Sequence, residues 1–441
     1  MASASTNDKI YALINYEDPY VQPLILAALE KRLPAETYEL ITTITQLPSP
    51  SSRLLQWVQY ESIDFDHLMD RSSTSTANAY VIRKALIRKH YLSTTIANWI
   101  TKYPDSLLKK HVKPSVEFEV DYAEFLDDAL IEAWDLKESW ARNEDKEVSE
   151  REWWILKPGM SDRGQGIRLF STEEELTTIF EEWDPPSDDE DEEEDARSDA
   201  DGDESDNIMT SQLRHFVAQP YIHPPLLLSP PSDSDSAPRK FHIRTYVLAT
   251  GALKVYVYKH MLALFAARPY IPPWHDGDRA EDLKAHLTNT CLQDSGDREG
   301  SVGSFWSLPD NLPNTTSPST PSTNWKEQMF TQLCAITGAT FEAAARGMSI
   351  HFQPLPNAFE IFGLDFMVSV EDDGELRCWL LEVNAFPDFR QTGEELSGLV
   401  EGLFEGVMEK AVKERFEIEG GKCENGEGDM VEVLDIDLGR R

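Results

Sequence analysis

Cysteine is scarce in this sequence. The 441 residues include four cysteines, Cys291, Cys334, Cys378 and Cys423, and no two of them form a CxxC pair. Such wide spacing fits neither a zinc site nor a dense disulfide framework. We therefore expect reduced thiols and a cytoplasmic protein.

Signals for secretion and for membrane insertion are also missing. The first twenty residues lack the basic stretch and the long apolar run of a secretory signal. No window approaches the roughly 20 apolar residues that a membrane helix needs. The sequence therefore predicts no membrane partner.

Basic residues are few. Lysine and arginine number 41 against 79 aspartates and glutamates, which gives a net charge of −38. Part of the excess lies in residues 188–206, where thirteen acidic residues stand against Arg197 alone. Nucleic acid is bound by clustered Lys and Arg and is repelled by acidic surfaces. The composition therefore argues against nucleic acid as a partner.

The pattern of apolar residues indicates a mixed α/β chain of several subdomains, because 441 residues exceed the usual size of one core. Strand-like and helical runs alternate over residues 10–44, and long helices are expected over 78–102 and 393–416. We divide the chain into an N-terminal α/β domain (1–75), a central subdomain (76–228), a C-terminal subdomain (239–416) and a loose acidic tail (417–441).

Two segments have the composition of insertions in surface loops. Residues 186–207 are too acidic to bury apolar surface, and residues 310–324 are rich in Pro, Ser and Thr. The acidic insertion has two interpretations. It is a solvated spacer, which is the ordinary role of a charge run, or it mimics an acidic acceptor.

A hairpin near the end of the chain carries candidate metal ligands. Asp365 lies in the apolar run FEIFGLDFMV, and Glu382 and Asn384 end the run WLLEVN. Positions 382 and 384 share one face because side chains alternate along a strand. If Asp365 lies opposite them, three oxygen ligands converge, which suits Mg²⁺ with a nucleotide. The alternative is a solvent-facing strand edge, although acids within such apolar runs are costly without a partner.

A lysine beside a glycine turn is the second candidate. Lys157 ends a strand, and Arg163 and Gln165 lie in the turn RGQG that follows. A strand lysine beside a flexible loop can neutralise the phosphates of a nucleotide while the loop closes over them. The Walker A pattern is absent, which disfavours a P-loop fold.

The run RKFHIRTYVL carries the third set of candidate site residues. Lys240, His242 and Arg244 alternate and so share one strand face, opposite Phe241 and Ile243. Three cationic or potentially cationic groups on one face indicate phosphate or carboxylate recognition. Taken alone, the pattern also fits a solvated strand face.

Six blocks in order resemble the tubulin-tyrosine ligase family, including its glutamylase and glycylase relatives. They are WWILKPGMSDRGQGI, FVAQPYIHPPLLL, RKFHIRTYVL, HLTNTC, FGLDFM and WLLEVNAFPDF, and the continuation PDFRQTG is similar to a fungal-type branch. The resemblance implies an ATP-grasp fold, in which two α/β subdomains clamp ATP and Mg²⁺. It also implies that ATP phosphorylates a protein carboxylate, on tubulin or another acidic protein, and that a free amino acid displaces the phosphate.

The resemblance also implies roles for individual residues. Asp365, Glu382 and Asn384 match the magnesium ligands, and Arg244 matches a residue at the transferring phosphoryl group and the acceptor carboxylate. The nucleotide contacts that it implies, with the turn residues named above, are Lys84, Lys157, Arg163, Gln165, Gln219, Tyr221, Ile222 and Lys240. We expect a cytoplasmic monomer, associated with microtubules or with mRNA-decay bodies.

Three positions depart from the family pattern. His242 stands where an aspartate is usual, Pro220 where a cation often follows the glutamine, and Leu264 near the place of an arginine that engages the acceptor. These departures leave a second hypothesis open. In it the chain is a catalytically reduced ATP-binding and protein-interaction module, linked in fungal relatives to cytoplasmic mRNA-decay bodies. A third, a small-molecule ATP-grasp ligase, fits HLTN and RKFHIR less well.

Overall fold

The structure is a computed structural model. It describes residues 9–159, 166–184, 214–231, 236–275, 279–288, 301–312, 324–392, 396–420 and 428–439. The chain forms two compact units. The first comprises Met1–Val112, Ile222–Tyr270 and Lys284–Arg441, and the second comprises Lys113–Tyr221 and Ile271–Leu283. The four-part division made from the sequence is finer than this and stays a prediction.

The first unit begins with a small parallel sheet whose strand order is β2-β1-β3-β4. Helix α1 follows β1, so the predicted opening strand and helix are confirmed, while the second strand is shorter than expected. The elements are β1 (Ile10–Asn15), α1 (Val21–Arg32), β2 (Tyr38–Ile41), β3 (Arg53–Val58), α2 (Phe65–Asp70) and β4 (Ser75–Ala77).

A larger antiparallel sheet carries the rest of the first unit. Its central strand β10 pairs with β12 and β11 along one edge and with β14 along the other, and β14 pairs with β15. The strands are β9 (Leu227–Leu228), β10 (Arg239–Thr250), β11 (Lys254–Tyr258), β12 (Leu262–Phe265), β13 (Val302–Ser304), β14 (Phe359–Val370), β15 (Leu376–Ala385) and β16 (Met430–Asp435).

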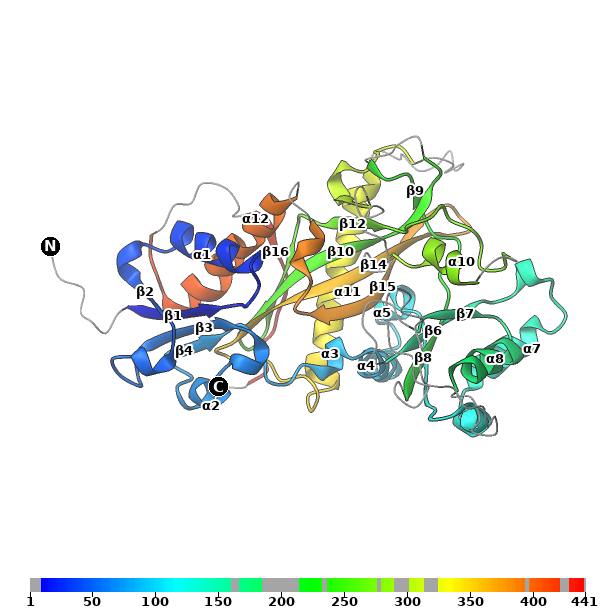
Figure 1. Cartoon of the computed structure of the whole chain (residues 1–441), viewed down its shortest axis with the longest axis horizontal. Coiled ribbons are helices and arrows are strands. Elements are labelled where there is room, and N and C mark those ends of the chain that lie inside the picture. The colour runs from blue at the N-terminus through cyan, green and yellow to red at the C-terminus, as the bar shows by residue number, and fades with distance from the viewer. Residues whose placement is uncertain are drawn as a thin grey trace, which may run out of the picture. The chain divides into compact units, whose positions relative to one another are not determined.

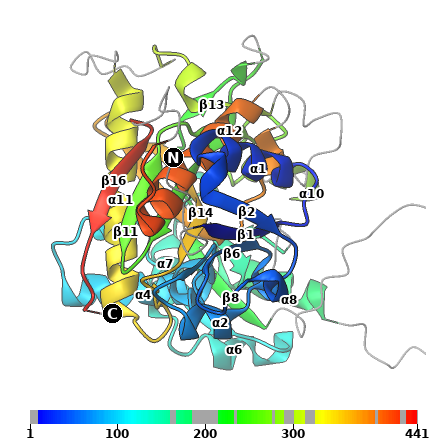
Figure 2. The same cartoon turned by 90° about the vertical axis from the view of Figure 1, so that its left-hand side faces the viewer.

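Apolar cores cover both faces of this sheet, which explains why its strands are rich in β-branched and aromatic residues. On one face the long helix α11 (Trp325–Gly347) packs against residues such as Phe241 and Ile243 (Figure 1). On the other face Tyr246 and Leu248 pack with α12 (Ser397–Val407), which lies beside α1 (Figure 2). The remaining helices of this unit are α3 (Lys84–Ile87), α4 (Lys89–Lys102), α5 (Leu108–His111) and α13 (Glu414–Phe416).

The second unit is built on a four-stranded antiparallel sheet of order β5-β8-β6-β7. Its core is aromatic, with Phe118, Phe180 and Phe216 packed together. The elements are β5 (Val116–Glu119), α6 (Leu126–Ala129), α7 (Trp134–Asn143), β6 (Trp154–Pro158), β7 (Arg168–Phe170), α8 (Glu173–Trp183) and β8 (His215–Pro220). Helix α10 (Arg279–His286) crosses the boundary between the units.

Of three sequence predictions about long helices and the tail, two are wrong and one is confirmed. Residues 78–102 do not form one helix, because the side chain of Asn78 pairs with the backbone of Val58 and Arg88 is extended between α3 and α4. The expected helix 393–416 is confirmed over Ser397–Phe416, where α12, a π-helical segment (Met408–Lys413) and α13 follow one another without a break. The tail contains β16, which pairs with β11.

Candidate functional site

Strands β14 and β15 bring the three predicted metal ligands together. Asp365 lies opposite Glu382, and Asn384 lies opposite Gly363, two positions away on the same face. The Asn384 Nδ2 donates to Glu382 Oε1 at 3.1 Å and to Asp365 Oδ2 at 3.4 Å. The two carboxylates and the amide therefore converge on one place, as the hairpin pattern predicts.

The donor set fits a magnesium ion. Two carboxylates and one amide offer hard oxygen ligands in the number that Mg²⁺ takes from protein when it also binds nucleotide phosphates. Within the described ranges no cluster of three or more His, Cys, Asp and Glu side chains could hold a metal, and the third donor of this set is the amide of Asn384. Its NH₂ group points at both carboxylates, and turning the amide presents Oδ1 instead.

Arg244 forms a two-point ion pair with Asp365. It lies opposite Asp365 across β10 and β14, and its Nε and Nη2 donate to Oδ1 and Oδ2, the latter at 2.9 Å. Burial raises the pKa of Asp365, but its interactions with Arg244 and His242 lower the pKa by more than burial raises it. The pKa of Asp365 therefore lies well below the usual range. The carboxylate is therefore ionised at any physiological pH, as a metal ligand must be.

Lys240 and His242 continue the same strand face. Their exposed fractions are 3% and 4%, against 7% for Arg244, so the alternative of a solvated strand face is wrong. The His242 Nδ1 is hydrogen-bonded to the Thr288 hydroxyl, and its Nε2 lies 3.4 Å from Asp365 Oδ1. Two buried cations on one strand face, Lys240 and Arg244, favour an anionic ligand.

The second unit positions its own candidates. On β6 the Lys157 Nζ donates to Gln219 Oε1 on β8 at 3.0 Å, and Gln219 Nε2 donates to the Lys113 carbonyl at 3.2 Å. Tyr221 follows β8, and its N–H donates to the Trp153 carbonyl. Lys157 and Gln219 are thus held side by side.

The other predicted nucleotide contacts are placed as follows. Ile222 belongs to the first unit and packs with Met367 and Trp379. Lys84 begins α3 and is exposed. Arg163 and Gln165 lie outside the described residues.

Lys89 also faces the candidate site, although no sequence pattern points to it, and its Nζ lies 3.8 Å from Glu382 Oε2. A continuous helix over 78–102 would put Lys84 and Lys89 on different faces, five residues or about 500° of rotation apart. The chain breaks at Arg88, and Lys89 starts the new helix α4 beside β15. Recognising that break would have drawn attention to Lys89.

Two of the departures from the family pattern lie in strands of the fold. Leu264 lies opposite His242 across β10 and β12, is 1% exposed and packs in the apolar core on that face. An apolar side chain therefore occupies the sheet face that carries Arg244. Pro220 ends β8 opposite Trp154, where it offers no backbone N–H.

Comparison with known proteins places this arrangement in a class. A solved structure, the C-terminal domain of Pby1 from K. lactis, matches with a TM-score of 0.67 and 35% identity over 97% of this chain and 99% of that one. Pby1 of K. lactis is described as an ATP-grasp enzyme interacting with the mRNA decapping enzyme Dcp2. The fold and the site define an ATP-grasp protein.

The model of the tubulin-tyrosine ligase family matches residues 74–418. A probable tubulin–tyrosine ligase of Schizosaccharomyces pombe is 44% identical over 95% of this chain and 94% of its own length. The probable tubulin–tyrosine ligase PBY1 of Saccharomyces cerevisiae is 40% identical over 98% of this chain, which spans 56% of that protein. This chain belongs to the tubulin-tyrosine ligase family.

None of the helices in the described parts of the chain is long and apolar enough to cross a membrane.

Proposed function

We propose that this chain is an ATP- and Mg²⁺-dependent ligase that joins a free amino acid to a carboxylate of an acidic protein, tubulin or another. The observation that carries the proposal is the ion pair of Arg244 with Asp365, shared through Asn384 with Glu382. The pair places the Arg244 guanidinium beside a set of ligands for a second cation, Mg²⁺. Such a pairing suits a reaction in which two anions, a phosphoryl group and a carboxylate, must meet.

The reaction has two steps. An oxygen of the acceptor carboxylate attacks the γ-phosphorus of ATP, and the bond to ADP breaks. The amine of the incoming amino acid then attacks the acyl carbon and loses a proton to solvent, a C–N bond forms, and phosphate leaves with the electron pair of the broken C–O bond. Bound magnesium would neutralise the phosphate charge during transfer.

The residues of this chain have distinct roles in that scheme. Asp365, Glu382 and Asn384 hold the ion, and Arg244 contacts the transferring phosphoryl group and the acceptor carboxylate. Lys89, which already faces Glu382, adds positive charge at the same edge. Lys157, Gln219, Tyr221, Ile222, Lys84, Lys240, Arg163 and Gln165 contact the nucleotide.

Transfer of labelled tyrosine, glutamate or glycine into tubulin and into other acidic proteins tests the proposal. We expect ATP-dependent incorporation that is lost in Asp365→Ala and kept in Asp121→Ala. Asp121 is a matched acid in an exposed ion pair with Arg214. Incorporation no greater than that of Asp365→Ala with every acceptor and amino acid would contradict ligase activity.

Nucleotide binding is tested separately by calorimetric titration with ATP and Mg²⁺. Glu382 is suited to this test because its side chain is 30% exposed, so Glu382→Ala removes a ligand without opening the core. We expect binding to the wild type and a large loss of affinity in Glu382→Ala. Equal affinity for both would remove the metal site from the proposal.

A second candidate is a protein-interaction module that keeps the fold but not the ligase reaction. The buried Leu264 favours it, because no cation stands at this position to engage an acceptor. Pby1 of K. lactis is described as interacting with Dcp2, so a partner in cytoplasmic mRNA-decay bodies is the natural candidate. Stable co-purification of the decapping enzyme with no amino-acid transfer would favour this function.

A further inference from the structure

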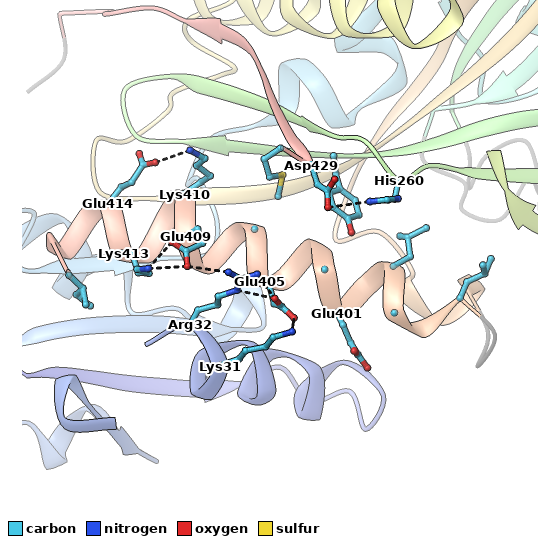
Figure 3. Close-up of a pocket in the computed structure, with 18 of the residues that line it drawn as sticks. Lys31, Arg32, His260, Glu401, Glu405, Glu409, Lys410, Lys413, Glu414 and Asp429 are labelled. Atoms are coloured by element: carbon cyan, nitrogen blue, oxygen red, sulfur yellow. Dashed lines mark hydrogen bonds and ion pairs between the residues drawn. The ribbon is translucent and has the colours of Figure 1, made fainter. Parts of the chain in front are cut away.

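A large groove lies away from the candidate site. Its volume is about 1040 Å³, and it runs along α12 and the π-helical segment, between the end of α1 and the strands β11 and β16 (Figure 3). None of the predicted nucleotide or metal contacts lines it. The helix that borders it runs from Ser397 to Phe416, about 30 Å at 1.5 Å per residue.

The helix is adapted to this groove. Gly398, Gly402 and Gly406 recur every fourth residue along the lining, although each glycine costs a helix about 1 kcal/mol relative to alanine. A Cβ on Gly402 would lie 2.4 Å from the Tyr258 hydroxyl, and one on Gly406 would lie 2.8 Å from Met430. The glycines therefore let two strands approach the helix closely. The π-helical segment that follows is a rare form found often at functional sites.

Tyr258 points a polar group into the groove that the protein itself does not satisfy. The residue is 2% exposed and lines the groove, and its hydroxyl has no hydrogen-bond partner among the described residues. Burial and the charges of Asp429 and Glu405 raise the pKa of the phenol. A hydroxyl in the wall of a groove, with carboxylates near it, favours a cationic donor as its ligand.

The charged side chains that line the groove carry an excess of negative charge. Seven carboxylates stand against four Lys and Arg side chains. Most are already paired, as Figure 3 shows: Glu405 with Arg32 and Lys31, Glu409 with Lys413, Glu414 with Lys410, and Asp429 with His260. Glu401 is exposed and forms no ion pair within the described part of the chain. It is therefore available to a ligand.

We propose that this groove binds a short peptide segment of a partner protein that alternates Lys or Arg with apolar residues. A cationic side chain donates to the Tyr258 hydroxyl and pairs with Glu401, and apolar side chains pack on Leu396, Leu399 and Ile418. A groove of about 30 Å accommodates roughly nine extended residues. A second copy of this chain is disfavoured as the occupant because each carries a net charge of −38.

Fluorescence polarisation with a labelled peptide of about nine residues, alternating lysine and leucine, tests the groove in the full chain. We expect saturable binding that weakens with salt. Tyr258→Phe should lower the affinity about threefold to tenfold by removing one hydrogen bond, and Glu401→Lys should lower it at least tenfold by reversing the charge. Glu132→Lys is the matched control, because Glu132 is exposed, belongs to the second unit and carries the same charge change.

Three results would overturn the proposed peptide groove. Equal weakening by Glu132→Lys and Glu401→Lys would show a general charge effect and remove the site. Displacement of the peptide by spermine at a similar concentration would remove the assignment to a peptide. A dimer of the wild type that is lost in Glu401→Lys would assign the groove to a second copy. Loss of ATP binding in Glu382→Ala does not bear on this test, because Glu382 is not in the groove.

Discussion

Gly363 lies against Arg244, so that a Cβ on this glycine would come within 3.4 Å of Arg244 Cδ and 2.9 Å of Pro387 Cβ. The missing side chain leaves room for the arginine to reach Asp365. Gly363 also lies opposite Asn384 on β15. One small residue thus fixes the spacing between the cation and the amide of the candidate site.

Gly363→Ala should therefore disturb the site more than the fold. We expect an overpacking cost of about 1–3 kcal/mol in the free energy of unfolding, measured by urea denaturation, and a clear loss of ATP affinity, measured by calorimetry. Gly428→Ala is the control, because a Cβ there has no heavy atom within 4 Å. Unchanged ATP affinity in Gly363→Ala would show that Arg244 tolerates the shift.

The buried pair of Arg244 and Asp365 gives a second prediction. Asp365→Asn leaves a buried guanidinium without its counter-charge, which should cost about 3–5 kcal/mol of stability. Arg244→Leu added to Asp365→Asn should recover part of this cost, because the guanidinium that lost its counter-charge is then removed as well. Urea unfolding of both variants is the measurement. A double variant less stable than Asp365→Asn would contradict this account of the cost.

The same pair sets a pH dependence. The folded-state pKa of Asp365 is depressed, so its contribution to stability is present above about pH 4 and is lost as the pH falls below that. We expect the wild type to lose stability relative to the double variant between about pH 4 and pH 2. Parallel stability curves over that range would contradict a depressed pKa.

Glu360 gives a pH effect of opposite sign. Burial raises its pKa to about 8, although Arg83 at 2.9 Å and the N–H of Tyr80 oppose the rise. The folded state binds the proton of Glu360 more tightly than the unfolded state does. The stability that this proton contributes is present below the unfolded pKa and is lost as the pH rises to about 8. Glu360→Gln keeps the shape but not the titration. We expect the melting temperature of the wild type, relative to this variant, to fall as the pH rises from about 5 to 9.

The sign of the stability change in Gly338→Ala shows whether helix propensity or packing dominates at this position. It lies within α11, where alanine would normally add about 1 kcal/mol of stability. A Cβ there would meet the backbone carbonyl oxygen of Val433, on β16, at 2.6 Å. Gly338→Ala should therefore destabilise the chain, as measured by thermal unfolding. A more stable variant would mean that β16 is not held against α11.

The features that depend on local alternation could be predicted from the sequence. The face shared by Lys240, His242 and Arg244, and the meeting of Asp365 with Glu382, follow from the two-residue period of strands joined by a short turn. Their burial could not be predicted, because it depends on cores formed by distant helices.

The helices and strands that the sequence did not predict correctly depend on contacts between distant segments. The chain breaks before α4 while the N–H of Ala85 bonds to the carbonyl of His351, a partner that no local pattern reveals. The strand β16 looks like a polar tail until its partner β11 is known. Helix α11 was not predicted, since its buried residues surround much of its circumference and give little periodicity.

The pairing of β10 with β14 also has a consequence for synthesis. Arg244 and Asp365 are 121 residues apart, so the ribosome must make more than a hundred further residues before the arginine meets its carboxylate. Contacts of such long range form slowly. A nascent chain that stops short of β14 exposes the edge of β10 that pairs with β14, and chaperones that shield strand edges should bind at this stage.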